Sequence, residues 1–287
     1  METKLSLKDR QVVISPERPF TIIGERINPT RRKKLAETMS QGDFSVVQED
    51  ARRQVEAGAQ VLDVNAGIPG GDEPALLRGA VQAVMQVVDV PLCMDTANPD
   101  ALEAALSVYP GKALINSTTA EESMMGRVFP LAKKYGAAVI GVITDESGVP
   151  PTPQARLEAA RKLIQRAGDY GIPPEDIVID CLALTVGADH TAGQVTLDSM
   201  VLVRQELGVN LSLGASNVSF GLPDRKIINV AYLSLAIARG LTAAITDPTV
   251  PEIQTALLAC DLLMGRDEYA MRWIKAFRKR EKATQAT

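Results

Sequence analysis

Short apolar runs, each followed by a helical pattern, recur eight times along this chain. They fall at 21–27, 60–66, 91–96, 113–119, 137–143, 177–183, 210–216 and 243–248. Both alternating faces of each run are apolar, as in parallel strands that helices cover on both sides. Eight such strands alternating with helices predict an α/β fold, a (β/α)8 TIM barrel in a single domain spanning residues 1–287.

The segments between the runs carry helix signals. Between Asp43 and Gly58 one apolar stripe passes through Val47, Ala51 and Val55, and Gly58 is placed to end the helix. Similar patterns lie at 152–168, 223–240 and 250–265. An open doubly wound sheet is the alternative fold, but the G-x-G-x-x-G typical of it does not follow the first strand.

Both ends of the chain lie outside this repeat. Residues 1–20 are expected to form an extension that caps the bottom of the barrel. The segment at about 267–280 is expected to be a C-terminal helix that packs through Ala270, Ile274 and Phe277. A membrane or nucleic-acid role for the basic residues of this helix is the less favoured interpretation.

Charge and cysteine usage exclude several classes of protein. The net charge of −4 argues against a nucleic-acid surface, and no apolar run approaches the roughly 18 residues of a spanning helix. The charged start METKLSLKDRQ is unlike a signal peptide, and the three cysteines form no C-x-x-C pair. These features predict a cytoplasmic protein. The single histidine, His190, excludes a cage of histidines around a metal and disfavours a Ser-His-Asp triad.

Polar side chains follow the apolar runs, where the mouth of a barrel would lie. They are Glu25, Arg26, Asn28, Asp63, Asn65, Asp95, Thr96, Asn116, Ser117, Thr144, Asp180, Ser216, Asn217 and Asp247. Turn formation or helix capping explains Ser117, Thr144 or Asp247 taken singly. It does not explain carboxylates placed directly after apolar residues, which need hydrogen-bond donors to offset their desolvation.

This set of residue types indicates one of two kinds of site. No lysine lies at a strand end, which disfavours a Schiff-base enzyme. Oxygen ligands could hold Ca²⁺ or Mg²⁺ at a site built from Asp63, Asp95, Asp180 and Asp247. The interleaved asparagines favour instead a flat heterocycle rich in N–H donors, such as a pterin, because amides offer both donors and acceptors. We therefore expect no protein-bound metal.

Several of these segments resemble the pterin-binding methyltransferase family, most of all its methyltetrahydrofolate:corrinoid methyltransferases. The segments are IGERINP, LDVNAG, CMDTANPDALEAAL, INSTTAEE, VIDCL and SNVSFGLPDR, in the family's order between residues 21 and 280. The resemblance implies a (β/α)8 barrel, a homodimer, tetrahydrofolate or 5-methyltetrahydrofolate as substrate, and a corrinoid (cobalamin) carried by a transient partner protein. The charge balance and the lack of a long apolar run, for their part, predict no nucleic-acid or membrane partner.

The resemblance also implies roles for particular residues. The pterin would be bound by Asp95, Asn116 and Asp180, and N5 of the folate would be contacted by Asn217. Further residues line the site or form a second layer near it: Gly214, Ser216, Arg225, Asp63 and Asn65. The stretch FGLPD at 220–224 departs from the enzymes that serve a corrinoid/iron–sulfur protein, so the partner's identity stays open.

The implied function is methyl exchange between N5 of (methyl)tetrahydrofolate and the cobalt of the corrinoid protein, with Asn217 and Asp180 as catalytic residues. Two alternatives remain. A dihydropteroate synthase-like enzyme would need a Lys-Ser-Arg cluster for a diphosphate, which SNVSFGLPDR does not provide. A noncatalytic folate- or corrinoid-binding subunit would bind pterin without transferring a methyl group.

Overall fold

Eight parallel strands form one sheet in the order β10-β3-β4-β5-β6-β7-β8-β9 in the computed structural model, which describes residues 1–285. The strands are β3 (Thr21–Ile27), β4 (Val61–Asn65), β5 (Leu92–Asp95), β6 (Leu114–Thr119), β7 (Ala138–Val142), β8 (Ile177–Asp180), β9 (Asn210–Ser212) and β10 (Ala243–Thr246). A bridge between Gly214 and Ile245 joins the two outer strands. The predicted (β/α)8 barrel is thereby confirmed, with each strand inside its predicted run.

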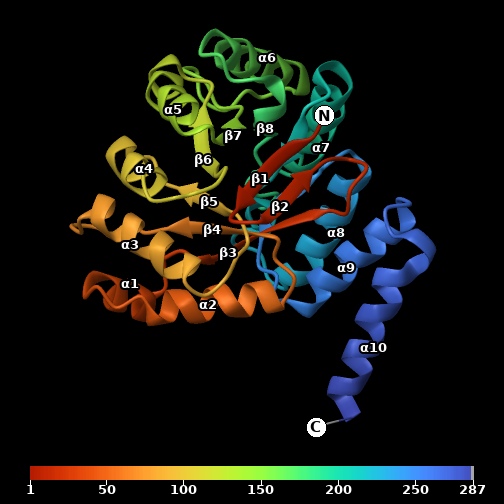
Figure 1. Ribbon diagram of the computed structural model, residues 1–287. Coiled ribbons are helices and arrows are strands. Elements are labelled where there is room, and N and C mark those ends of the chain that lie inside the picture. Colours follow the sequence, from red (N-terminus) through yellow and green to blue (C-terminus); the bar gives the residue numbers. More distant parts are fainter. Residues whose placement is uncertain (286–287) are drawn as a thin grey trace.

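Helices surround this sheet (Figure 1). They are α1 (Lys33–Ser40), α2 (Ser45–Glu56), α3 (Glu73–Met85), α4 (Pro99–Leu106), α5 (Glu122–Tyr135), α6 (Pro153–Asp169), α7 (Ala192–Leu207), α8 (Arg225–Ala238), α9 (Pro251–Leu263) and α10 (Met271–Gln285). Side chains of Asp72, Asn98 and Thr152 accept hydrogen bonds from the first backbone N–H groups of α3, α4 and α6, which sets where these helices begin.

Apolar side chains are buried in two layers. The larger layer lies between the strands and the surrounding helices. The smaller one fills the barrel near the first residues of the strands and includes Ile23, Val61, Leu114 and Val178. Because this interior layer is apolar near the first residues of the strands, the C-terminal halves of the strands are where carboxylates such as Asp63 and Asp95 gather.

A hairpin of β1 (Thr3–Leu7) and β2 (Arg10–Ile14) covers the N-terminal end of the barrel. Leu5 and Ile14 are fully buried and pack into the interior cluster. The amide of Asn210 donates to the backbone oxygen of Ile14 at 2.8 Å, and Ser6 N–H donates to the backbone oxygen of Lys112 at 3.0 Å. The N-terminal extension therefore closes the bottom of the barrel.

The C-terminal helix α10 stands away from the barrel (Figure 1). Its first turn is tied down by Asp261, which is buried and pairs with Arg272 at 2.6 Å. Beyond that turn, Ile274 and Phe277 are 38% and 47% exposed, so the expected packing of this apolar face is only partial. Left-handed backbone at Tyr269 and at Ala270, in the short η3 turn (Glu268–Ala270), redirects the chain before the helix begins.

Among the described helices, none combines the length and apolar character that crossing a bilayer requires.

Arg156 of α6 fixes two loops at the other end of the barrel. Its buried guanidinium donates to the backbone oxygens of Pro150 at 3.0 Å and Cys181 at 2.8 Å, and to the hydroxyl of Thr196 at 3.0 Å. These three acceptors belong to the loop after β7, the loop after β8 and helix α7. One side chain thus holds together the loops that flank Asp180.

We expect the substitution Arg156→Leu to lower the free energy of unfolding by about 3 kcal/mol, because it leaves buried backbone oxygens without donors. Urea denaturation followed by circular dichroism measures this change. Arg161→Leu on the same helix removes only exposed ion pairs with Glu158 and Glu206, so its effect should stay below about 1 kcal/mol. Equal effects of the two substitutions would contradict the role of Arg156.

Candidate functional site

Carboxylates and amides from three neighbouring strands are linked at the C-terminal end of the barrel. The amide of Asn116 on β6 donates to Asp63 Oδ1 on β4 at 3.0 Å. The amide of Asn65 on β4 donates to Asp95 Oδ2 on β5 at 3.0 Å and to the backbone oxygen of Asp95 at 3.1 Å. The register pairs Asn65 with Asp95 and Asp95 with Asn116, so these three side chains lie at one level of the sheet, while Asp63 pairs with Cys93 two positions earlier along β4.

Desolvation dominates the electrostatics of this cluster. Burial, together with the nearby Asp95 carboxylate, raises the pKa of Asp63 well above its ordinary value. Burial also raises the pKa of Asp95, while the hydrogen bond from Asn65 acts in the opposite direction. A pair of close, buried carboxyl groups of this kind holds a proton more readily than exposed ones do. The cluster can therefore both accept and donate hydrogen bonds.

Asp180 lies across the mouth at the end of β8. Its two carboxylate oxygens accept from the backbone N–H groups of Leu182 at 2.7 Å and Gly214 at 3.2 Å. Burial raises the pKa of Asp180 to about 6, and these two hydrogen bonds limit the rise. Asp180 is therefore largely ionised near neutral pH and is available as an acceptor for N–H donors of a ligand.

Glu25, near the end of β3, is joined to the short helix η2 (Ala215–Ser219) that follows β9. The hydroxyl of Ser216 donates to Glu25 Oε1 at 3.1 Å. Burial raises the pKa of Glu25 to about 7, and the neighbouring carboxylate of Asp247 acts in the same direction. Near neutral pH this side chain holds a proton about half of the time, which suits a general acid.

The remaining predicted residues lie around η2. Arg225 donates to the backbone oxygen of Ser216 at 2.6 Å and to the hydroxyl of Ser219 at 3.0 Å. Asn217 is exposed at the mouth. A Cβ atom on Gly214 would lie 3.2 Å from the amide nitrogen of Asn217, so a larger residue there would crowd this amide.

The predicted site residues thus gather into three groups at one end of the barrel: the Asp63–Asn65–Asp95–Asn116 cluster, Asp180 with Gly214, and the η2 group of Ser216, Asn217 and Arg225. Asp247, one of the four ligands of the alternative cation site, belongs to none of them. It pairs with Arg26 at 3.5 Å and accepts from Thr249 N–H at 2.9 Å, as a turn residue does. Among residues 1–285 the structure contains no group of His, Cys, Asp and Glu side chains arranged to hold a metal ion.

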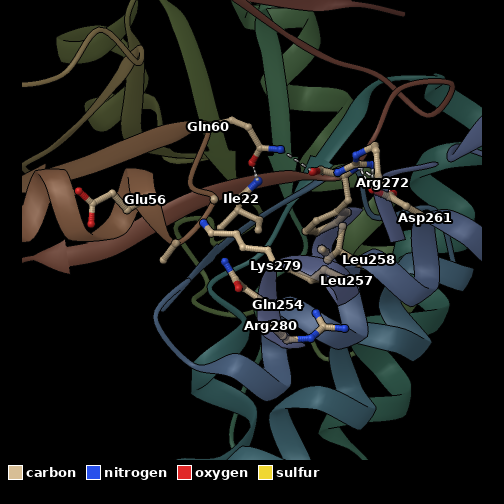
Figure 2. Close-up of a pocket in the computed structure, with 14 residues that line it drawn as sticks. Ile22, Glu56, Gln60, Gln254, Leu257, Leu258, Asp261, Arg272, Lys279 and Arg280 are labelled. Carbon is tan, nitrogen blue, oxygen red and sulfur yellow. Dashed lines mark hydrogen bonds and ion pairs between the residues drawn. The ribbon is translucent and has the colours of Figure 1, made fainter. Parts of the chain in front are cut away.

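A cavity of about 380 Å³ lies away from this site (Figure 2). It is enclosed by α2, α9 and α10 and lined by Ile22, Gln60, Gln254, Leu257 and Lys279. Ile22 is close to the first residue of β3 and Gln60 directly precedes β4, so the cavity lies near the N-terminal end of the strands. None of the predicted site residues lines it.

Sequence reasoning placed Glu25 at a strand end but gave it no role. Its signal was similar to that of Asp63 and Asp95, a carboxylate that follows an apolar run, here with Gly24 in between. Sequence reasoning also gave no role to Arg31 or Phe220, which the structure brings together at the mouth with the Arg31 guanidinium 5.1 Å from the ring centre. No sequence pattern linked these two residues, because 189 positions separate them along the chain.

The chain belongs to the family of pterin binding enzymes, whose model matches residues 24–247. This range contains every predicted site residue and ends at Asp247.

Among curated relatives, the chain is 29% identical over 264 residues to the methylcorrinoid:tetrahydrofolate methyltransferase of Eubacterium limosum, covering 90% of this chain and 96% of that one. It is also 29% identical over 265 residues to methionine synthase of Mycobacterium tuberculosis, of which it spans 22%. Among solved structures it is similar to a dihydropteroate synthase of Xanthomonas albilineans, with a TM-score of 0.69 and 19% identity over 92% of this chain and 98% of that chain. It is also similar to a dihydropteroate synthase of Yersinia pestis, with a TM-score of 0.67 and 18% identity over 91% of this chain and 98% of that chain. At such identities these structures show the shared fold alone.

The raised pKa of Glu25 makes stability depend on pH. The folded protein binds this proton more tightly than the unfolded chain does, so the resulting stabilisation is complete below about pH 4.5 and is lost as pH rises to about 7. In the wild-type protein this loss lowers the free energy of unfolding between about pH 4.5 and about pH 7. We expect the decrease to be smaller by about 2–3 kcal/mol in Glu25→Gln.

Urea titrations at several pH values measure this difference. Glu49→Gln, at an exposed position on α2, serves as the control and should reproduce the pH profile of the wild-type protein. Parallel profiles for Glu25→Gln and the wild-type protein would show that Glu25 has an ordinary pKa in the folded state.

Proposed function

We propose that this protein transfers a methyl group between N5 of (methyl)tetrahydrofolate and the cobalt of a corrinoid held by a partner protein. The observation that carries the proposal is the hydrogen-bonded cluster of Asp63, Asn65, Asp95 and Asn116, with Asp180 held separately by backbone N–H groups at the same end of the barrel. The similarity to the Eubacterium limosum methyltransferase over 90% of the chain supports the same conclusion. A cytoplasmic location and a transient corrinoid protein partner are parts of this proposal.

A pterin ring offers an amino group and ring N–H groups as donors and a carbonyl oxygen as an acceptor. Asp95 and Asp180 would accept hydrogen bonds from the N–H donors of the ring. The amide of Asn116 would donate a hydrogen bond to the carbonyl oxygen of the ring. Asp63 would hold Asn116 in place and Asn65 would hold Asp95, through the hydrogen bonds already described. Such fixed partners let the site bind the ring without reorganising during the reaction.

Methyl transfer from the folate needs no nucleophile from this protein, because cobalt in the Co(I) state attacks the methyl carbon. The C–N5 bond breaks and its electron pair stays on N5, a poor leaving group unless a donor compensates the developing charge. The exposed amide of Asn217 would donate toward N5. Glu25, linked to the same short helix through Ser216, would supply the proton that N5 finally takes up.

A corrinoid is too large to enter a barrel filled with side chains. The partner protein must therefore present it at the open end, with the pterin bound so that N5 faces solvent. Dihydropteroate synthase chemistry is the weaker candidate, since the structural likeness to those enzymes is at 15–19% identity and the diphosphate-binding residues are missing from this sequence.

The test is methyl transfer from 5-methyltetrahydrofolate to free cob(I)alamin by the purified protein, followed in single-turnover spectra. Asn217→Ala should slow the transfer by a factor of about 10²–10³, as loss of one preorganised donor does, while folate affinity changes little. Binding of the folate by fluorescence or calorimetry separates the two effects.

Two outcomes would contradict the proposal. Folate binding without any methyl transfer by the wild-type protein would favour the noncatalytic subunit, and an unchanged single-turnover rate in Asn217→Ala would remove Asn217 from the mechanism. Asn98→Ala is a suitable control, because this asparagine caps α4 and accepts hydrogen bonds from the backbone there. It should alter stability by about 1 kcal/mol and leave the transfer rate unchanged.

We also propose that the protein forms a homodimer through α8, α9 and α10. The proposal is supported by large apolar side chains exposed on these three consecutive helices: Ile227, Leu235, Leu263, Met271 and Phe277. Sedimentation should show a dimer, and Leu263→Asp combined with Phe277→Asp should shift it toward the monomer with an unchanged circular dichroism spectrum. A monomeric wild-type protein would contradict this assignment.

A further inference from the structure

Positive charge at the mouth of the barrel is confined to one sector. Among the described loops that follow the eight barrel strands, only the loop between β3 and α1 contains arginine or lysine, namely Arg31 and Arg32. Arg225 adds a third guanidinium as the first residue of α8. Arg32 is engaged within the fold, because it pairs with the buried Asp50 at 2.6 Å. Arg26, near the end of β3, pairs with Asp247 at 3.5 Å, whereas Arg31 and Arg225 are exposed at this rim.

These two arginines converge on one aromatic ring. The guanidinium carbon of Arg31 lies 5.1 Å from the centre of the Phe220 ring, and that of Arg225 lies 5.9 Å from it. Phe220 is 49% exposed, and its backbone oxygen accepts from the hydroxyl of Thr185 at 2.7 Å. The two hydrogen bonds that Arg225 makes to η2 fix its position and leave further N–H groups for a ligand.

The rest of the rim carries the opposite charge. The loops after β4, β6, β7 and β8 contain no arginine or lysine, and their carboxylates are Asp72, Glu121, Asp145, Glu146 and Asp189. Of these, Glu146 is neutralised by an ion pair with Lys162 of α6 at 2.9 Å. The basic sector also contains two carboxylates, Asp224 next to Arg225 and Asp247, which pairs with Arg26 at 3.5 Å. An anionic chain that leaves the mouth is therefore repelled on one side and attracted across Phe220 on the other.

We propose that Arg31, Phe220 and Arg225 form a subsite for the p-aminobenzoyl-glutamate tail of the folate substrate, and that this subsite favours folates with several glutamate residues. The inference rests on the proposed function, since it needs a pterin in the barrel mouth. The inference adds a preference among folates of different glutamate number, which neither the fold nor the pterin-binding residues determine.

The chemistry of the tail matches this sector. The aromatic ring of the tail provides apolar surface for contact with Phe220, and its glutamate carboxylates match the planar fork of an arginine. Each added glutamate brings one more negative charge near two guanidiniums. Because the subsite is exposed, its contribution should fall as the salt concentration rises.

The experiment compares three ligands in the intact protein: 6-methyltetrahydropterin, tetrahydrofolate with one glutamate, and tetrahydrofolate with three glutamates. We expect the wild-type protein to bind the triglutamate most tightly and the pterin least tightly, with the greatest salt dependence for the triglutamate. Arg31→Ala should weaken triglutamate binding by about tenfold, equivalent to about 1.4 kcal/mol, and leave binding of the pterin unchanged.

Phe220→Ala provides a second variant, which should reduce the difference between the monoglutamate and the pterin. Arg127→Ala removes one exposed arginine from α5 and controls for the change in net charge. Equal affinities of the wild-type protein for the three ligands would overturn the inference while leaving the proposed function intact. Failure to bind any of them would overturn both.

A third outcome would identify a different occupant. If Arg31→Ala slowed methyl transfer with a corrinoid protein but left all three affinities unchanged, the sector would be a docking surface for an acidic protein, and the assignment to the folate tail would be wrong.

Discussion

Closure of the sheet between β9 and β10 determines where the chemistry of this barrel takes place. The bridge from Gly214 to Ile245 joins the outer strands, and Gly214 N–H donates to Asp180 on the neighbouring strand. This seam holds η2 above the barrel, so that Ser216 reaches Glu25 on the far side of β10. Without closure, the carboxylates after β4 to β8 and the short helix after β9 would not share one opening.

Gathering carboxyl groups at this opening is electrostatically unfavourable, because they are partly removed from water. Carboxyl groups withdrawn from water keep their protons more readily, and in this barrel amide and backbone donors offset part of the desolvation. The balance differs among them, since Asp180 accepts from two backbone N–H groups whereas Glu25 accepts from one hydroxyl. Asp180 and Glu25, at the same end of the barrel, can therefore be ionised and protonated respectively at the same pH, which is what separate acceptor and acid roles require.

The sequence was sufficient to predict the barrel, because eight apolar runs with helix signals between them are compatible with few other folds. It was sufficient for placing Asp63, Asp95, Asn116 and Asp180 at one end, because strand ends coincide in a parallel sheet. It did not predict the strands within residues 1–20, or that Ile274 and Phe277 would remain half exposed. Those outcomes depend on long-range contacts, such as that of Asn210 with Ile14, and on backbone turns at Tyr269 and Ala270 that no local pattern indicates.

The hairpin that fills the N-terminal end of the barrel has a kinetic consequence. Leu5 and Ile14 seal that end, which leaves the mouth as the single route into the strand ends. Under the proposed function, the folate and the corrinoid protein must then reach the site through the same opening, and the folate, as the smaller of the two, binds deeper. Folate would therefore bind first and dissociate last, so turnover would follow a compulsory order. The carrier protein would bind to, and dissociate from, an enzyme that already holds the folate.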